Sequence, residues 1–267
     1  MSDFLPTLVS EICAAQGITC TRLSRDWVLR LEKNGCIRFI TGYKFGLNPH
    51  SVGYLCDDKY ALACVLQAAG LPTLTQEIFY QPANREPYAR TRHTGPDLVA
   101  WAHQHSGDIV LKPNDSSCGL DVTRVTTDAQ ILAAYQCLSP RYFALNASVY
   151  APLVCEYRVV MLQGCPRLIY AKHAAPGEWR FNLFTGGSAS LFTDKKMRLQ
   201  LEKLATRAAT ACQLVFGSVD IGQTATGQLL IVEINSGVML EHFAAQFPAE
   251  LSTVRALYAA AIAAMFA

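Results

Sequence analysis

The chain has 267 residues, 51% of them hydrophobic and 16% charged, so it can bury a sizeable core as one large or two small domains. A formal net charge of only +2, spread along the sequence, argues against nucleic-acid or membrane-surface partners. The ten cysteines form no CxxC pair and lie mostly in apolar segments, so we expect free thiols in a reducing compartment. The start, MSDFLPTL, lacks the features of a signal peptide, and the tail 254–267 is too short to span a bilayer, so a cytoplasmic protein is expected.

The first 55 residues predict a small unit of mixed structure. Apolar residues at helical spacing cover Leu5–Gln16, and Ile18–Leu23 has the composition of a strand. Trp27–Leu31 and Cys36–Ile40 are predicted to pair as a hairpin, because an Asn-Gly dipeptide between them is a strong turn signal. Thr41–Tyr54 is rich in glycine, proline and asparagine, so we expect an irregular loop there.

Residues 56–143 are predicted to alternate helices and strands. A helix starts at Asp57-Asp58, carries Lys59 in its first turn and ends at Gly70. The other elements expected in this stretch are a strand at Thr73–Phe79, a polar loop at Gln81–Thr94, a helix at Pro96–His105, strands at Asp108–Leu111 and Asp121–Thr126, and a helix at Asp128–Leu138.

The loop Pro113–Leu120 follows a strand and Lys112 directly. Hydroxyls of Ser116 and Ser117 and backbone N–H groups around Gly119 can hold a polyphosphate, while Lys112 supplies a point charge. The loop is not a Walker A motif, because its lysine precedes the glycine and no helix follows. Taken alone, it is read equally well as an ordinary hairpin loop with an exposed lysine.

The second half, 144–267, is predicted to be rich in strands. Tyr142–Tyr150, Cys155–Leu162 and Arg167–Lys172 are expected to form a meander with a turn at Gly164-Cys165-Pro166. After it we expect a glycine-containing loop with Arg180, Asn182, Gly187 and Ser188, an amphipathic helix at Asp194–Cys212, and a last helix at Pro248–Ala267.

Two apolar runs within 213–234 flank a short turn with a Thr-Gly dipeptide, which predicts a β-hairpin. With the turn centred on that dipeptide, Asp220 lies opposite Glu233, with Cβ atoms about 5 Å apart. Asn235 shares the face of Glu233, because strand side chains alternate. Clustered carboxylates repel unless a hard cation such as Mg²⁺ joins them. The alternative is two surface acids on an exposed hairpin face.

Together these segments resemble the motifs of the ATP-grasp superfamily in order and spacing. The segments are Lys59 in DDKYALACVLQAAGLPT, Lys112 in IVLKPNDSSCGLDV, Glu156 and Arg158 in CEYRVVML, Arg180 to Ser188 in RFNLFTGGSA, and Asp220 with Glu233-Ile234-Asn235. The resemblance covers residues 57–241 and is nearest to the ribosomal-protein glutamate ligases, cyanophycin synthetase and bifunctional glutathione synthetases. It implies an α+β fold in which two α+β lobes grip ATP, and an acyl phosphate that an amine attacks.

The resemblance also implies a role for each matching residue. The nucleotide would contact Lys59, Lys112, Ser116, Ser117, Gly119, Glu156 and Lys172, with Glu156 at the ribose hydroxyls. The transferring phosphoryl group or the substrate carboxylate would contact Arg158 and Arg180. Mg²⁺ or Mn²⁺ would be held by Asp220, Glu233 and Asn235. The substrate would lie near Asn182, Gly187, Ser188 and His242.

Three cations on the predicted metal-bearing lobe, Arg158, Lys172 and Arg180, exceed what a triphosphate with Mg²⁺ needs, because Lys59 and Lys112 come from the other lobe. The excess predicts a second bound anion, for which a carboxylate awaiting phosphorylation is the simplest choice. We expect Arg180 to bind it, because a planar guanidinium can contact both carboxylate oxygens.

We therefore expect a reduced N-terminal segment at 1–55, an N-terminal lobe at 56–143, and a C-terminal lobe with the metal site at 144–267. Because the first segment is shorter than in the family, part of the substrate site would be missing or come from a partner chain in a homodimer. The predicted function is an ATP-dependent carboxylate–amine ligase acting on an amino acid, a peptide or a related metabolite. A phosphotransferase and a non-catalytic ATP-binding regulatory module stay open as alternatives.

Overall fold

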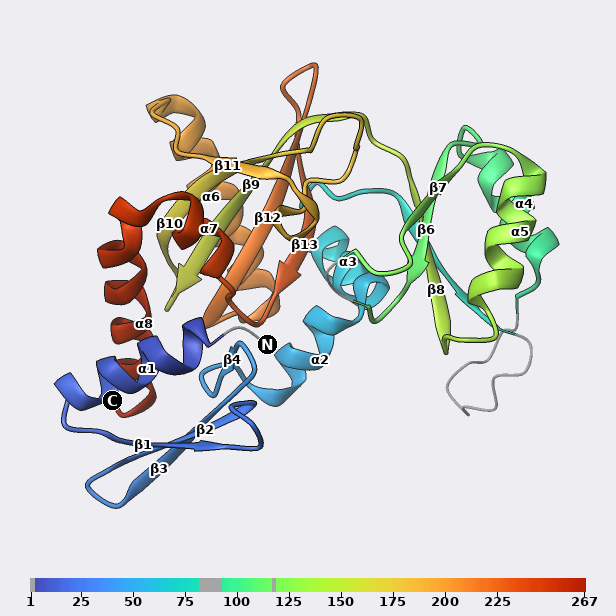
Figure 1. Cartoon of the computed structure of the whole chain (residues 1–267). Coiled ribbons are helices and arrows are strands. Elements are labelled where there is room, and N and C mark those ends of the chain that lie inside the picture. Colours follow the sequence, from blue (N-terminus) through green and yellow to red (C-terminus); the bar gives the residue numbers. More distant parts are fainter. Residues whose placement is uncertain (1–2, 82–92, 117–118) are drawn as a thin grey trace.

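The computed structural model describes residues 3–81, 93–116 and 119–267. The strands of these residues form three antiparallel sheets, with the orders β1-β2-β3-β4, β5-β8-β6-β7 and β11-β10-β9-β12-β13. Figure 1 shows the five-stranded sheet in the middle of the molecule, with the other two sheets on different sides of it. Within the described residues, no helix is both long and apolar enough to cross a membrane.

The N-terminal unit packs against the end of the chain. It consists of α1 (Phe4–Ala15), β1 (Thr19–Leu23), β2 (Val28–Lys33), β3 (Cys36–Thr41), β4 (Lys44–Phe45) and α2 (His50–Asp57). Apolar residues of α1 share one core with those of α8 (Leu251–Met265), and Figure 1 shows the two helices side by side. The predicted helix and hairpin are confirmed, with Asn34 and Gly35 both at positive φ in the turn.

The loop expected at Thr41–Tyr54 was wrong in its second part, where α2 begins at His50 after Pro49. Val52 and Cys56 of this helix are buried in the core that also contains one face of the five-stranded sheet. Packing of these two side chains explains why a helix forms although local composition favours a loop.

The next lobe consists of α3 (Lys59–Ala68), β5 (Gln76–Tyr80), α4 (Gly95–Gln104), β6 (Ile109–Pro113), β7 (Thr123–Val125), α5 (Asp128–Leu138) and β8 (Ala144–Val149). The predicted helix at Lys59 is confirmed, with the Asp58 side chain accepting a hydrogen bond from Ala61 N at 2.9 Å. Helices α4 and α5 cover one face of the sheet and enclose its core. Most of the polar loop predicted at 81–94 lies outside the described residues.

Strand β8 corrects the predicted meander. It pairs with β5 and β6 and therefore belongs to the sheet of this lobe, not to that of β9 (Leu153–Leu162). The chain leaves β8 at Tyr150-Ala151-Pro152 and enters β9 in the other sheet. Pro152 has no N–H for a strand ladder, which is consistent with a break between the sheets here.

The remaining lobe is built on the five-stranded sheet, with cores on both faces. Its further elements are β10 (Cys165–His173), η1 (Leu183–Thr185), β11 (Ser188–Ser190), α6 (Lys195–Cys212), β12 (Phe216–Thr224), β13 (Leu229–Asn235), α7 (Glu241–Gln246), η2 (Pro248–Glu250) and α8. The α6 helix and the β12–β13 hairpin were predicted, whereas η1, β11 and α7 were not. The β9–β10 turn is Gln163-Gly164, both at positive φ, one residue earlier than predicted.

Candidate active site

A cavity of about 760 Å³ lies where the three sheets meet. It is lined by thirteen of the sixteen predicted site residues: Lys59, Lys112, Ser116, Gly119, Glu156, Arg158, Lys172, Arg180, Asn182, Asp220, Glu233, Asn235 and His242. Gly187 and Ser188 do not line it, and Ser117 lies outside the described residues, as does Cys118. A Cβ at Gly187 would lie 2.7 Å from Asn182 O, so this glycine permits a close backbone approach.

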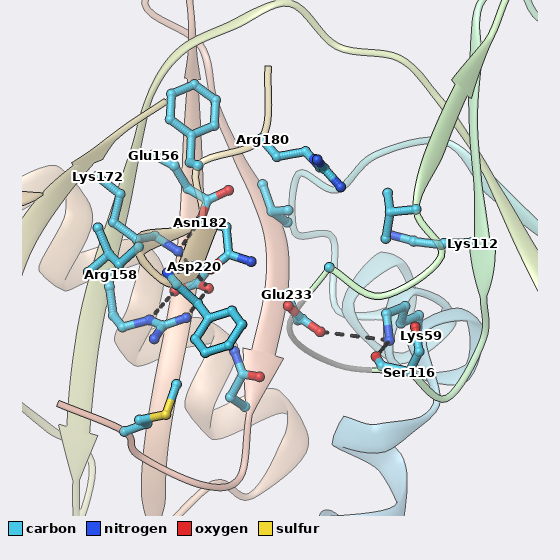
Figure 2. A pocket seen from close by; sticks show the side chains of 18 of the residues that line it. Lys59, Lys112, Ser116, Glu156, Arg158, Lys172, Arg180, Asn182, Asp220 and Glu233 are labelled. Atoms are coloured by element: carbon cyan, nitrogen blue, oxygen red, sulfur yellow. Dashed lines mark hydrogen bonds and ion pairs between the residues drawn. The ribbon is translucent and has the colours of Figure 1, made fainter. Parts of the chain in front are cut away.

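Lys59 joins the N-terminus of α3 to the predicted phosphate loop. Its Nζ donates to the carbonyl of Ser116 and, at 3.4 Å, to that of Asn114, and it lies 3.9 Å from Oε1 of Glu233 (Figure 2). Asn114 accepts a hydrogen bond from Tyr60 N at 3.1 Å and donates its own N–H to Ala144 O at 3.0 Å. These contacts hold the start of the loop beside the hairpin that carries Glu233.

Lys112 points into the cavity from the end of β6, and Figure 2 shows Arg180 pointing into the same space from the opposite side. No carboxylate of a described residue lies within 4.0 Å of its ammonium group. Burial of this group lowers the pKa of Lys112 to about 8. A partly buried cation without a close anion is a site where a bound anion would be stabilised.

Four charged side chains form a buried network on the five-stranded sheet. Arg158 donates to both oxygens of Asp220, at 2.8 and 2.7 Å, and Lys172 donates to Oδ2 of Asp220 at 3.1 Å and also contacts Glu156 (Figure 2). The strand register causes this arrangement, because Glu156 pairs with Lys172 and Asp220 pairs with Arg158.

The network shifts the pKa values of its two carboxyl groups in opposite directions. Burial alone would raise the pKa of Asp220, but the charges of Arg158 and Lys172 outweigh it and hold that pKa below its usual value. Burial raises the pKa of Glu156, although Lys172 opposes the shift. The predicted contact of Glu156 with ribose hydroxyls stays a prediction, and in the free protein this carboxylate is an ion-pair partner of Lys172.

Each of the three cations that the sequence suggested to be in excess has a carboxylate partner in the fold. Arg158 and Lys172 are paired within the network, and Arg180 binds Glu178 at 2.6 Å. That hydrogen bond from Arg180 lowers the pKa of Glu178 to about 2. The Nε of Arg180 is nevertheless buried without a hydrogen-bond partner among the described residues, so one donor remains for a ligand.

The predicted register of the β12–β13 hairpin is confirmed, because Asp220 pairs directly with Glu233. The Glu233 side chain is 33% exposed, and Nδ2 of Asn235 is buried without a partner among the described residues. Oδ1 of Asp220 accepts one hydrogen bond, which leaves it a further lone pair. Two carboxylates and an amide oxygen are ligands that suit Mg²⁺, so the donor set fits this ion.

Residues that the sequence did not single out also line the cavity. Tyr150 lies where the chain crosses between the lobes, and Trp179 lies in the loop between β10 and η1; their ring centroids are 5.8 Å apart. Trp27, Thr41, Tyr43 and Lys44 come from the N-terminal sheet. The chain's own first segment therefore contributes to the cavity wall, whereas the expectation that part of the substrate site is missing or comes from a partner chain stays a prediction. The aromatic residue Trp27, at the start of the predicted hairpin, was the one available signal.

The five-stranded sheet, the neighbouring α+β lobe and the cavity between them define an ATP-grasp fold. Among solved structures, D-cycloserine synthetase DcsG has a TM-score of 0.60 with 18% identity, covering 82% of this chain and 73% of its own. Residues 97–253 match the family described as the RimK-like ATP-grasp domain, so the chain belongs to that family.

Two curated relatives have about 30% identity with parts of the chain. A glutathione synthetase of Parasynechococcus marenigrum is 30% identical over 129 residues, which are 47% of this chain and 42% of the relative. A probable alpha-L-glutamate ligase of Alcanivorax borkumensis is 31% identical over 157 residues, which are 55% of this chain and 47% of the relative. The chain thus matches less than half the length of either relative.

Proposed function

We propose that the protein is an ATP- and Mg²⁺-dependent ligase that joins a carboxylate to an amine, with an amino acid or peptide as substrate. The observation that carries the proposal is the distribution of unpartnered polar groups. Six buried side-chain N or O atoms of the described residues have no hydrogen-bond partner, and four of them belong to cavity-lining residues: Arg180, Asn235, Ser236 and His242. Buried polar groups without partners are uncommon, so their concentration here supports a polar ligand.

The nucleotide would lie between the two lobes. Lys59 and Lys112 would contact its phosphates, and N–H groups around Gly119 would close over them. Trp179 and the face of Tyr150 that Arg124 does not cover would provide flat apolar surfaces for the base. Membership of the RimK-like ATP-grasp family and the relatives' names, glutathione synthetase and glutamate ligase, support this assignment.

Mg²⁺ would be held by Glu233, Asn235 and the free lone pair of Asp220. When bound there, it would neutralise phosphate charge and orient the phosphates. Arg158 and Lys172 would hold Asp220 in place and keep it ionised, which is a positioning role.

In the proposed reaction a carboxylate oxygen attacks the γ-phosphorus and the bond to the β-phosphate oxygen breaks, which yields an acyl phosphate and ADP. The amine then attacks the acyl carbon, loses a proton, and expels phosphate as the amide forms. Phosphoryl transfer needs mainly positioned positive charge, which Lys112 and Arg180 would supply from opposite sides of the cavity.

Nine described cysteines are free thiols, which supports a cytoplasmic location.

The test is a screen of ADP release over paired amino acids and dipeptides, followed by transfer of ¹⁸O from the labelled carboxylate of any active acid. A ligase that works through an acyl phosphate delivers one label to the released phosphate. A stable phosphorylated product would indicate the phosphotransferase instead. ATP binding without ADP release in any pairing would favour the regulatory module, and label retained wholly in an amide product would exclude the acyl phosphate.

A further inference from the structure

The cavity has two chemically different ends. Lys59 and Lys112 lie at the proposed nucleotide end, whereas the end beside the N-terminal sheet carries the rings of Trp27, Tyr43, Phe184 and His242, which we call the aromatic end. Trp27 is 47% exposed and Phe184 is 65% exposed, and the rings of Phe184 and His242 lie 5.7 Å apart edge to face. Large exposed rings that line a cavity offer apolar surface to a ligand.

The position of Trp27 depends on a neighbouring glycine. A Cβ built at Gly42 would lie 2.8 Å from the indole ring, so only the absence of a side chain lets the ring pack over this residue. Gly42 N also donates to Trp27 O at 2.8 Å. One side of the indole is therefore supported by backbone, while the ring still lines the cavity.

The aromatic end is attached directly to the segment that follows the proposed metal ligands. Tyr43 O accepts a hydrogen bond from Val238 N at 3.1 Å, and a Cβ at Gly237 would lie 3.1 Å from the same oxygen. Asn48 donates to Phe216 O at 2.6 Å and to Ser236 O at 3.3 Å. The N-terminal sheet is thereby held at a fixed position relative to the hairpin of Glu233 and Asn235.

Among the described residues that line the cavity, the N-terminal sheet offers no unpaired cation to an acidic side chain. Lys44 is the one lysine or arginine that the N-terminal sheet contributes to the lining described here, and its Nζ lies 2.5 Å from Asp57. An acidic side chain would need an unpaired cation at this end. Aromatic or aliphatic groups lose water at little cost and gain contact with the rings.

We propose that this end selects a substrate carrying an aromatic or bulky aliphatic side chain, with Trp27 as the residue that determines the specificity. This inference rests on the proposed ligase function. It distinguishes the protein from an enzyme that selects glutamate, and it assigns the N-terminal sheet a role in substrate recognition.

Binding separates this inference from the ligase reaction. The Mg²⁺- and AMP-PNP-loaded protein is titrated by calorimetry with L-phenylalanine, L-leucine, L-alanine and L-glutamate, in wild type and in Trp27→Ala and Trp27→Phe. Phe39→Ala is the matched control, because Phe39 is 49% exposed on the same sheet but does not line the cavity. Thermal melting of each variant confirms that it is folded.

L-Phenylalanine and L-leucine should bind at least about tenfold more tightly than L-alanine and L-glutamate. Trp27→Ala should remove that preference, Trp27→Phe should restore part of it, and Phe39→Ala should not change it. The inference would be overturned if L-glutamate bound more tightly than L-phenylalanine, or if L-phenylalanine did not bind. It would also be overturned if Trp27→Ala kept the same preference as the wild type. Preferential binding without ADP release in any pairing would retain the specificity site and reject the ligase function.

Discussion

Lys112 should take up a proton when ATP binds. In the free protein burial lowers its pKa to about 8, and no carboxylate of the described part of the chain lies within 4.0 Å of it. A phosphate group beside the ammonium would restore the pKa toward its ordinary value, because a nearby anion favours the charged form. Binding should therefore be linked to protonation of this side chain.

The size of the effect follows from the pKa of about 8 in the free protein. At pH 8 about half of the free molecules carry the proton and nearly all of the complex does, so uptake is about 0.5 proton per ATP. By pH 9.5 only about 3% of the free molecules are protonated, so affinity for metal-free ATP should fall roughly 15-fold between these values. Stability without nucleotide should increase above pH 8, because the unfolded chain holds the proton more tightly than the folded one.

Calorimetric titration with ATP and EDTA, in two buffers of different ionisation enthalpy at pH 8, measures the uptake directly. Lys112→Arg is the matched control, because a guanidinium stays protonated throughout this range and its binding should be nearly independent of pH. No proton uptake in the wild type, or the same pH dependence in Lys112→Arg, would refute the reasoning.

Three further changes test other parts of the site. Glu233→Gln should abolish turnover and weaken nucleotide binding only when Mg²⁺ is present; unchanged activity would reject the metal assignment. Arg180→Lys should lose far more turnover, measured by steady-state kinetics, than ATP affinity, measured by equilibrium titration. Equal losses would argue against contact of Arg180 with the transferring phosphoryl group or the substrate carboxylate. Asn48→Ala removes bonds to Val215 N, Phe216 N, Phe216 O and Ser236 O. This substitution should lower the free energy of unfolding, measured in urea, by about 2–4 kcal/mol. Asn48→Asp should keep the two hydrogen bonds that the side-chain oxygen accepts. An unchanged urea midpoint in Asn48→Ala would show that Asn48 contributes little to stability.

The sequence by itself determined the elements whose signals are local. The caps and apolar stripes of α3, α5 and α6 predicted those helices, because such signals lie within a few residues of one another. The opposition of Asp220 and Glu233 was also predictable, since a hairpin turn sets the register of its two strands. The helix at His50–Asp57 was not predictable, because distant apolar residues stabilise it against its own composition.

Only the tertiary structure decided which strands share a sheet and which charges meet. From its position in the sequence, strand β8 could have joined either the sheet of β5 and β6 or the sheet of β9. Its pairing with β5 and β6 assigns it to the first of these. The carboxylate partners of Arg158 and Lys172 come from neighbouring strands distant in sequence, so counting cations along the chain overestimated the free charge. The aromatic end depends on the docking of the N-terminal sheet onto Val238, a contact between segments almost 200 residues apart that no local pattern specifies.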